Sequence, residues 1–202
     1  MSTRAAASTR RSAALARRRE ARERIEAAAE RLLRGQPYRT LTVDHVMAEA
    51  GLSRTVFYRH FDGLPELVLS LLHAIGDELA AEVAEPPRPG RTREVLAAAI
   101  DAFARHGPFM RAVQDAASHD ETIEEAYRVF VDGFTAAIAA TIEVGMADGH
   151  IAPGNAYELA RALNLMNGQY LLDTLGRDPG FDRELALDTL MAVWGPVTSY
   201  AR

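Results

Sequence analysis

Hydrophobic residues recur with the 3.6-residue period of an α-helix along most of this 202-residue chain. Ile25, Ala28, Ala29 and Leu32, for example, lie on one face of the first periodic segment. No segment alternates between apolar and polar positions over the length of a strand, and there is no internal repeat. The pattern therefore predicts an all-α protein of about nine helices, at 14–34, 43–50, 54–60, 64–84, 92–106, 108–117, 121–148, 155–176 and 182–201.

Changes of composition divide the chain into three parts. Residues 1–13 are rich in Ser, Thr, Ala and Arg, which predicts a disordered basic arm. The clearest linker is the sequence EPPRPGR at residues 85–91, because Pro and Gly interrupt the helical period there. We expect a small helical head domain over residues 14–62 and a larger helical body domain over residues 63–202.

Two short helices with a tight turn between them are predicted inside the head domain. Thr42 is a suitable N-cap for the first of them, Gly51 closes it, and Ser53 is a suitable N-cap for the second. Phe57 and Phe61 are four residues apart, so both face inward while the polar side chains between them face outward. Such a helix-turn-helix fits the major groove of DNA, although a helical hairpin with an ordinary surface is the alternative.

The net charge of −5 conceals a strong asymmetry along the chain. Residues 1–61 contain 13 Arg against 6 Asp and Glu, a balance of +7. Residues 62–202 contain 10 Arg against 22 acidic residues, a balance of −12. A basic segment of this kind attracts a polyanion, but it is equally typical of a solvated helix with Arg/Glu pairs.

Several classes of function lack their sequence signals. There is no cysteine, no apolar run long enough to cross a membrane, and no apolar region after the Arg10-Arg11 pair, so we expect a cytoplasmic protein. The six histidines are scattered, and neither a zinc-protease motif nor a phosphate-binding loop nor a nucleophile elbow occurs. We therefore expect neither an enzyme nor a bound cofactor or metal.

The segment LTVDHVMAEAGLSRTVFYRHFDGLPELV resembles the DNA-binding head of the TetR family of bacterial transcriptional regulators. The resemblance covers about residues 20–70 and implies a dimer whose two recognition helices enter successive major grooves of a double-stranded DNA operator. It also implies which residues contact DNA, with Tyr58 and His60 mainly on phosphates. These residues are Thr42, Ser53, Arg54, Thr55, Val56, Tyr58, Arg59 and His60.

One position departs from the pattern of that family. The family often has a lysine three residues after the His-Phe pair, whereas this chain has Leu64. The phosphate contact of that lysine is therefore expected to be missing. Arginines of the amino-terminal arm are candidates to replace it, because basic arms of this kind reach into the minor groove.

Polar residues interrupt an otherwise apolar helix face in the body domain. Asn164 and Asn167 are three residues apart in the sequence ELARALNLMNGQYLLDTLG. A buried amide must find hydrogen bonds or cost about 1–3 kcal/mol. The two asparagines therefore satisfy backbone groups, cross a dimer interface, or meet a ligand in an apolar cavity.

A narrower resemblance favours the ligand among these alternatives. The sequence ALNLMN, the sequence AFARHGPFMRA and the single Trp in the last predicted helix resemble the ethionamide-resistance subgroup of the TetR family. That subgroup binds elongated hydrophobic ligands in a tunnel, anchored by two asparagines three residues apart. The residues implied to bind a ligand here are Phe103, Phe130, Phe134, Ile138, Asn164, Asn167, Leu171 and Trp194. Taken alone, each of the three phenylalanines is better explained by ordinary core packing.

The resemblance also implies a homodimer, formed by the last two helices as a four-helix bundle. Together these features predict a transcriptional regulator, most simply a repressor that is released from its operator by a small hydrophobic molecule. Two alternatives remain open: an architectural protein that binds DNA without any ligand, and a transcriptional activator.

Overall fold

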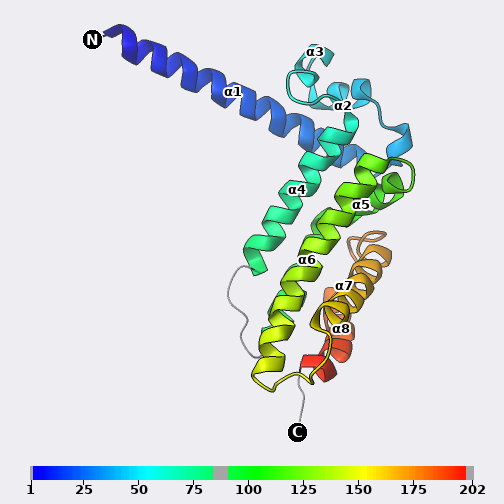
Figure 1. The fold of residues 1–202 in the computed structure, drawn as a ribbon. Coiled ribbons are helices and arrows are strands. Elements are labelled where there is room, and N and C mark those ends of the chain that lie inside the picture. Colours follow the sequence, from blue (N-terminus) through cyan, green and yellow to red (C-terminus); the bar gives the residue numbers. More distant parts are fainter. Residues whose placement is uncertain (1, 84–90, 199–202) are drawn as a thin grey trace. The chain divides into compact units, whose positions relative to one another are not determined.

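The computed structural model describes residues 2–83 and 91–198 of the chain. These two ranges contain eight α-helices and one short 3-10 helix, and they contain no strand (Figure 1). The all-α prediction is therefore confirmed. The elements are α1 (Ser2–Leu33), η1 (Tyr38–Thr40), α2 (Val43–Ala50), α3 (Arg54–Phe57), α4 (Leu64–Val83), α5 (Thr92–Ala117), α6 (Glu121–Ala147), α7 (Ala156–Asp173) and α8 (Arg183–Thr198).

The chain forms two compact units, a head unit (Met1–Leu71) and a body unit (Leu72–Arg202). The division falls inside α4, later than the expected boundary after residue 62. Ser70 in the first half of α4 explains the shift, because its hydroxyl accepts a hydrogen bond from Arg22 of α1 at 2.6 Å. Residues 85–90 of the predicted linker lie outside the described residues, as does residue 84 before it.

The head unit is built around side chains that the helical period had assigned to its core. Ile25 of α1 and Phe57 of α3 are fully buried. Helix α2 begins where Thr42 Oγ1 accepts a hydrogen bond from the backbone N–H of His45 at 3.1 Å. It ends at Gly51, whose φ of 64° lies in the left-handed region that favours glycine. Both predicted ends of this helix are confirmed.

Two predictions about the head unit are corrected by the structure. Residues 2–13 belong to α1 instead of forming a disordered arm, because this stretch is rich in alanine, the strongest helix former, and contains neither Gly nor Pro. Helix α3 ends at Phe57, short of the predicted residue 60. Ser53 occupies its N-cap position, yet its side chain makes no capping hydrogen bond.

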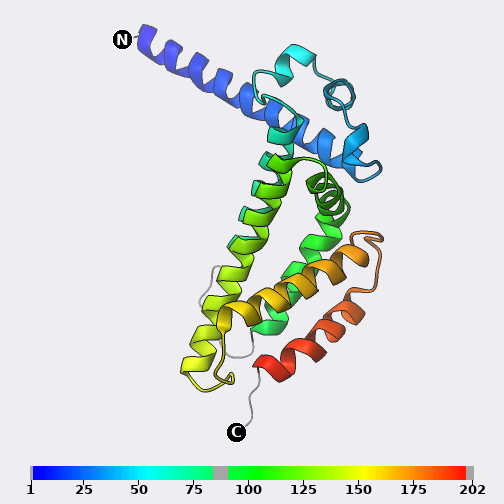
Figure 2. The ribbon, with the colours of Figure 1, turned by 45° about the vertical axis from the view of Figure 1, so that its right-hand side comes forward.

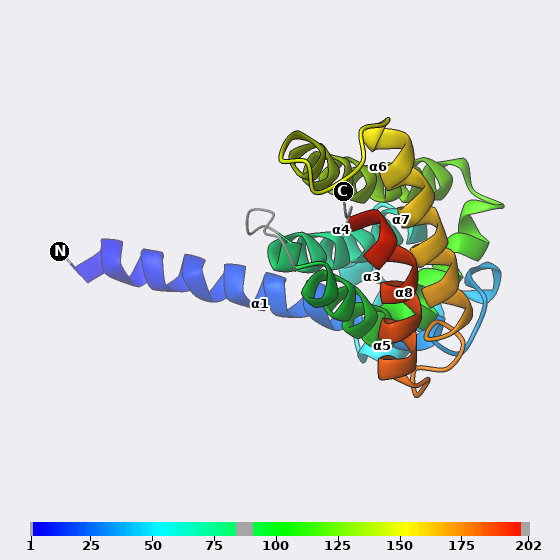
Figure 3. The same ribbon diagram turned by 90° about the horizontal axis from the view of Figure 1, so that it is seen from below.

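The body unit consists of the second half of α4 and of α5 to α8. Helix α6 packs against both α5 and α7, and α8 packs mainly on α5. Helices α7 and α8 run side by side along one side of the unit in two different views (Figures 2 and 3). Side-chain caps begin two of these helices, since Asp120 caps α6 and Asn155 caps α7.

The predicted break at Gly107-Pro108 does not occur, because α5 continues through both residues. The glycine serves close packing instead. A Cβ atom built on Gly107 would lie 2.8 Å from the Cα atom of Gly176, in the turn between α7 and α8. Only a residue without a side chain allows the two segments to approach this closely.

Helix α6 is more apolar than the sequence analysis indicated. It is long and apolar enough to cross a membrane, with a mean hydropathy of 1.5 over its best window, and it is the one such helix among the described residues. A single helix of this kind is weak evidence for a membrane protein. Several of its apolar side chains instead line the cavity described below.

Candidate functional site

The polar side chains around α3, which include most of the residues expected to contact DNA, are called the recognition surface below. Phe57 and Phe61 point into the core, as predicted. Among the eight residues expected to contact DNA, Val56 and His60 are half-buried and the other six are exposed: Thr42, Ser53, Arg54, Thr55, Tyr58 and Arg59. Seven of the eight lie on or directly beside α3, and Thr42 caps the start of α2.

Arg54 is held in place by two neighbours. Its Nη1 atom lies 3.1 and 3.0 Å from the two carboxylate oxygens of Asp44, and its Nη2 atom donates to the Tyr58 hydroxyl at 3.3 Å. The guanidinium also lies over the Tyr58 ring, 5.7 Å from its centroid. The hydrogen bond to Tyr58 and the charge of Asp44 both raise the pKa of Arg54. The positive charge of Arg54 is therefore partly balanced by Asp44 at the protein surface.

His60 lies at the border between the recognition surface and α1. Partial burial lowers the pKa of His60, and the nearby positive charges of Arg18 and Arg22 lower it further. The imidazole is therefore neutral at neutral pH in the DNA-free protein. Arg18 also donates to the backbone oxygen of Arg59 at 3.3 Å, which ties α1 to the end of the recognition segment.

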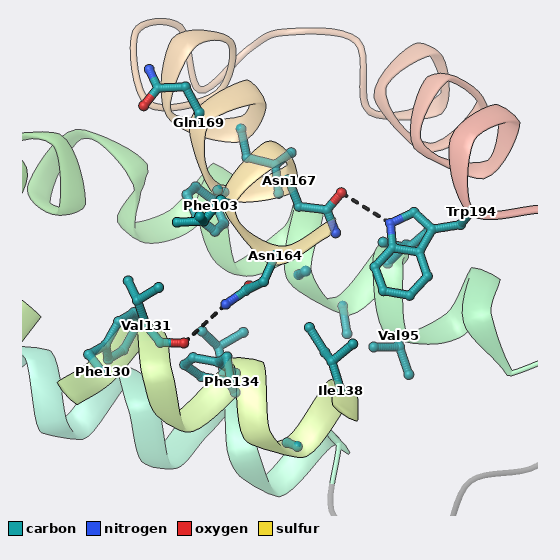
Figure 4. Close-up of a pocket in the computed structure, with 18 of the residues that line it drawn as sticks. Val95, Phe103, Phe130, Val131, Phe134, Ile138, Asn164, Asn167, Gln169 and Trp194 are labelled. Atoms are coloured by element: carbon teal, nitrogen blue, oxygen red, sulfur yellow. Dashed lines mark hydrogen bonds between the residues drawn. The ribbon is translucent and has the colours of Figure 1, made fainter. Parts of the chain in front are cut away.

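The body unit contains a cavity of about 290 Å³, near the lower end of the usual size for a small-molecule site. Its wall is mostly apolar and comes from α4, α5, α6, α7 and α8 (Figure 4). The eight residues expected to bind a ligand all belong to this wall: Phe103, Phe130, Phe134, Ile138, Asn164, Asn167, Leu171 and Trp194. The sequence analysis missed the polar wall residues Arg91, Thr92, Gln114, Tyr127, Thr141 and Gln169.

Asn164 joins α7 to α6 at the middle of the cavity. Its Nδ2 atom donates to the backbone oxygen of Val131 and to the hydroxyl of Thr135, each at 3.0 Å. A backbone oxygen can only accept, so the amide must present its nitrogen to Val131 and its oxygen elsewhere. Thr135 is buried and has no signal in the sequence, because it resembles any other threonine on a helix.

Asn167 has the opposite orientation. Its Oδ1 atom accepts a hydrogen bond from Nε1 of Trp194 at 3.1 Å, and an indole nitrogen can only donate. Among the described residues, no protein group is hydrogen-bonded to Asn167 Nδ2 or to Asn164 Oδ1. The two asparagines thus offer the cavity one donor and one acceptor, a pair that can bind a polar group of a ligand.

Two further groups complete the description of the cavity. Gln114 Nε2 donates to Gln169 Oε1 at 3.3 Å, which joins α5 to α7. Burial raises the pKa of Tyr127, so its hydroxyl stays protonated and remains a donor at neutral pH.

No cluster of His, Asp and Glu able to hold a metal ion is found within the part of the chain that the structure describes.

Comparison with known proteins agrees with this division into head and body. Residues 25–71 match the family model for bacterial regulatory proteins of the tetR family, and residues 92–199 match the model for the C-terminal domain of the transcriptional regulator EthR. The HTH-type transcriptional regulator EthR of Mycobacterium tuberculosis is 32% identical over 180 residues, which cover 84% of this chain and 83% of that protein. EthR of Mycolicibacterium smegmatis is 30% identical, over 84% of this chain and 82% of the relative.

Solved structures agree on the fold. The regulatory protein TetR from Rhodobacter sphaeroides superposes with a TM-score of 0.71 at 18% sequence identity, over 87% of this chain and 97% of that one.

Proposed function

Because this chain belongs to the TetR family of DNA-binding transcriptional regulators, and its body to the EthR type, we propose that it is a repressor that binds a two-fold symmetric operator as a dimer and is released by a small hydrophobic molecule. The family is not one of enzymes, which agrees with the absence of catalytic motifs from the sequence. We expect the protein to act in the cytoplasm, where its operator lies.

The observation that carries the ligand part of this proposal is the cavity of the body unit. It combines an apolar wall with a donor on Asn167 and an acceptor on Asn164, and such a combination is typical of a small-molecule site. An architectural protein that binds DNA without a ligand does not require a donor and an acceptor that face an apolar cavity. The cavity therefore favours a regulator that responds to a ligand.

The DNA part rests on the recognition surface around α3. Arg54 and Arg59 can reach guanine edges or phosphates, and the Tyr58 hydroxyl can reach a phosphate. Leu64 begins α4 where relatives often carry a phosphate-binding lysine, so α3 and the arginines of α1 would have to supply the backbone contacts.

The dimer would form through α7 and α8. Their described surfaces expose large apolar side chains that a second copy can cover, among them Leu165 on α7 and Leu185 on α8. Two recognition helices about 34–36 Å apart would then fit successive major grooves. A ligand that prefers a dimer with another spacing lowers DNA affinity, by no more than its differential affinity for the two forms. Helix α4 contributes to both units, so it is the natural element to transmit the change.

The first test is a footprint of the purified protein on DNA that flanks its own gene, at two salt concentrations. A protected, two-fold symmetric stretch that weakens with salt and disappears with an added hydrophobic ligand is the expected result. Protection that no ligand changes would favour the architectural alternative. Protection that a ligand strengthens would favour an activator or a co-repressed regulator.

A further inference from the structure

An acidic side chain lies among the basic and hydroxyl groups of the recognition surface. Asp44, in the first turn of α2, is 66% exposed, and it contacts Arg54 of α3, which is 59% exposed. A carboxylate near a surface that binds DNA opposes the approach of the phosphates. The place of Asp44 on this surface therefore requires a reason, either structural or functional.

Stability does not supply that reason. An exposed ion pair contributes little to the free energy of unfolding, because water screens the charges and both side chains lose conformational freedom. Helices α2 and α3 pack against each other, and each has buried apolar side chains, among them Val46 and Met47 of α2 and Phe57 of α3. The contact between Asp44 and Arg54 is therefore better explained by its effect on the arginine.

Three contacts restrict the guanidinium of Arg54. Its Nη1 atom lies 3.1 and 3.0 Å from the two carboxylate oxygens of Asp44, and its Nη2 atom donates to the Tyr58 hydroxyl at 3.3 Å. Its carbon Cζ lies 5.7 Å from the centroid of the Tyr58 ring. A long side chain that is already restricted loses less conformational entropy when it binds a partner.

These contacts leave part of the guanidinium available to DNA. An arginine side chain has five N–H donors, and within the described part of the chain none of the hydrogen bonds of Arg54 uses Nε. Nε and the second hydrogen of Nη2 can therefore still donate. Guanine presents two neighbouring acceptors in the major groove, O6 and N7, and a pair of arginine donors matches them.

The negative charge of Asp44 favours a base edge over a phosphate as the partner of Arg54. A phosphate is an anion, so the carboxylate repels it and competes with it for the same guanidinium. A guanine edge is a neutral acceptor, so it can bind the outer donors of Arg54 while Asp44 keeps its own contact.

We propose that Asp44 is a positioning residue for the recognition of DNA sequence, whose carboxylate holds Arg54 in place to bind a guanine and keeps it from the phosphates. This inference rests on the proposed function of the recognition surface as the DNA-binding site. It narrows the partner of Arg54 from either a base or a phosphate to a guanine. It also implies that removal of the acid makes DNA binding tighter and less selective.

Selection from a duplex library, randomised over about 30 base pairs to hold two half-sites one helical turn apart, measures the selectivity. Sequences bound by the wild-type protein, by Arg54→Gln and by Asp44→Asn are compared. We expect the wild type to select a guanine at one position of each half-site and Arg54→Gln to lose this preference. Asp44→Asn should lower it about tenfold. Only bound duplexes are counted, so a partial loss of folded protein does not change the result.

The affinity for a duplex of A·T pairs alone, measured by fluorescence anisotropy at low salt, gives the second readout. Asp44→Asn should bind this duplex about threefold more tightly per subunit, which is the effect of one charge at roughly 6 Å from a phosphate in water. If Asp44 only stabilised the fold, its replacement would weaken this binding.

Glu49→Gln is the matched control, because it removes the same charge from the same helix. Glu49 pairs with Arg31 of α1 at 2.8 Å and not with an arginine of α3. The variant should keep the full preference for guanine.

Three results would overturn the inference. They are an Asp44→Asn protein with the base preference of the wild type, weaker binding of Asp44→Asn to the A·T duplex, and an equal loss of preference in Glu49→Gln. Failure of the proposed function looks different, since the wild-type protein would then enrich no sequence from the library.

Discussion

Replacing Asn164 by leucine tests the structural role of this residue in the ligand-free protein. The substitution keeps a similar volume but removes two hydrogen bonds, to Val131 O and to Thr135 Oγ1. No buried group loses its last partner, because Thr135 Oγ1 still donates to Val131 O at 3.0 Å. The expected loss is therefore the net value of two hydrogen bonds, about 1–3 kcal/mol. For a chain of this size it corresponds to a melting temperature about 2–12 °C lower.

The assay is a thermal or urea melt of the ligand-free protein, with a double-mutant cycle against Thr135→Val. If the two side chains form one network, the double variant is less unstable than the sum of the singles, by about 0.5 kcal/mol or more. Asn167→Leu loses one hydrogen bond, to Trp194, and should destabilise the protein less. Additive effects within error, or an Asn164→Leu protein as stable as wild type, would refute the assignment of Asn164 as a link between α6 and α7.

Three shorter predictions concern other parts of the molecule. Gly107→Ala should lower the free energy of unfolding by about 1–3 kcal/mol in a urea titration, because the new methyl group overpacks against Gly176, 2.8 Å away. Arg54→Ala should weaken operator binding on the order of tenfold in a fluorescence anisotropy titration, because the arginine is expected to read a base edge. His60→Gln should flatten the pH dependence of stability. Because folding lowers the pKa of His60, the neutral imidazole contributes its full share to the free energy of unfolding above the unfolded pKa near 6.5. That contribution is lost as the pH falls toward the pKa of the folded protein.

Each of these predictions has a control or an outcome that would contradict it. Gly145→Ala should cost less than Gly107→Ala, because the new methyl group meets the movable side chain of Ile151 and not a backbone. Arg54→Ala should leave the melting temperature nearly unchanged, since Arg54 is exposed; unaltered DNA binding would remove it from the recognition surface. A wild-type protein whose stability does not fall between neutral pH and pH 5 would contradict the analysis of His60.

The sequence was sufficient for the helix-turn-helix because each of its signals is local. Thr42 caps, Gly51 adopts a positive φ, and Phe57 and Phe61 lie one turn apart, so neighbours along the chain decide all of these features. The membership of the asparagine pair in one cavity wall was also predictable, since it follows from the family pattern and the helical period.

Features that depend on contacts between segments far apart in the chain could not be predicted from local sequence signals. Gly107-Pro108 signals a break in any local analysis, and only the approach of Gly176 reveals why α5 needs a glycine there. The place of Arg91 in the cavity wall follows from how α5 packs in the body unit, whereas in the sequence it is the last residue of a Pro-rich linker. Thr135 acquires its role from Asn164, 29 residues away along the chain.

The net positive charge of the head unit does not give the number of arginines that are available to contact DNA. Arg24 donates to the backbone oxygen of Ala50 at 2.6 Å, and Arg31 pairs with Glu49 at 2.8 Å, so these two arginines hold α1 against α2. Arg22 is similarly engaged, with Glu26 and Ser70. A basic segment can therefore use much of its charge to fix its own helices. We therefore expect a polyanion to meet a smaller set of arginines directly, among them the exposed Arg59, which follows the end of α3.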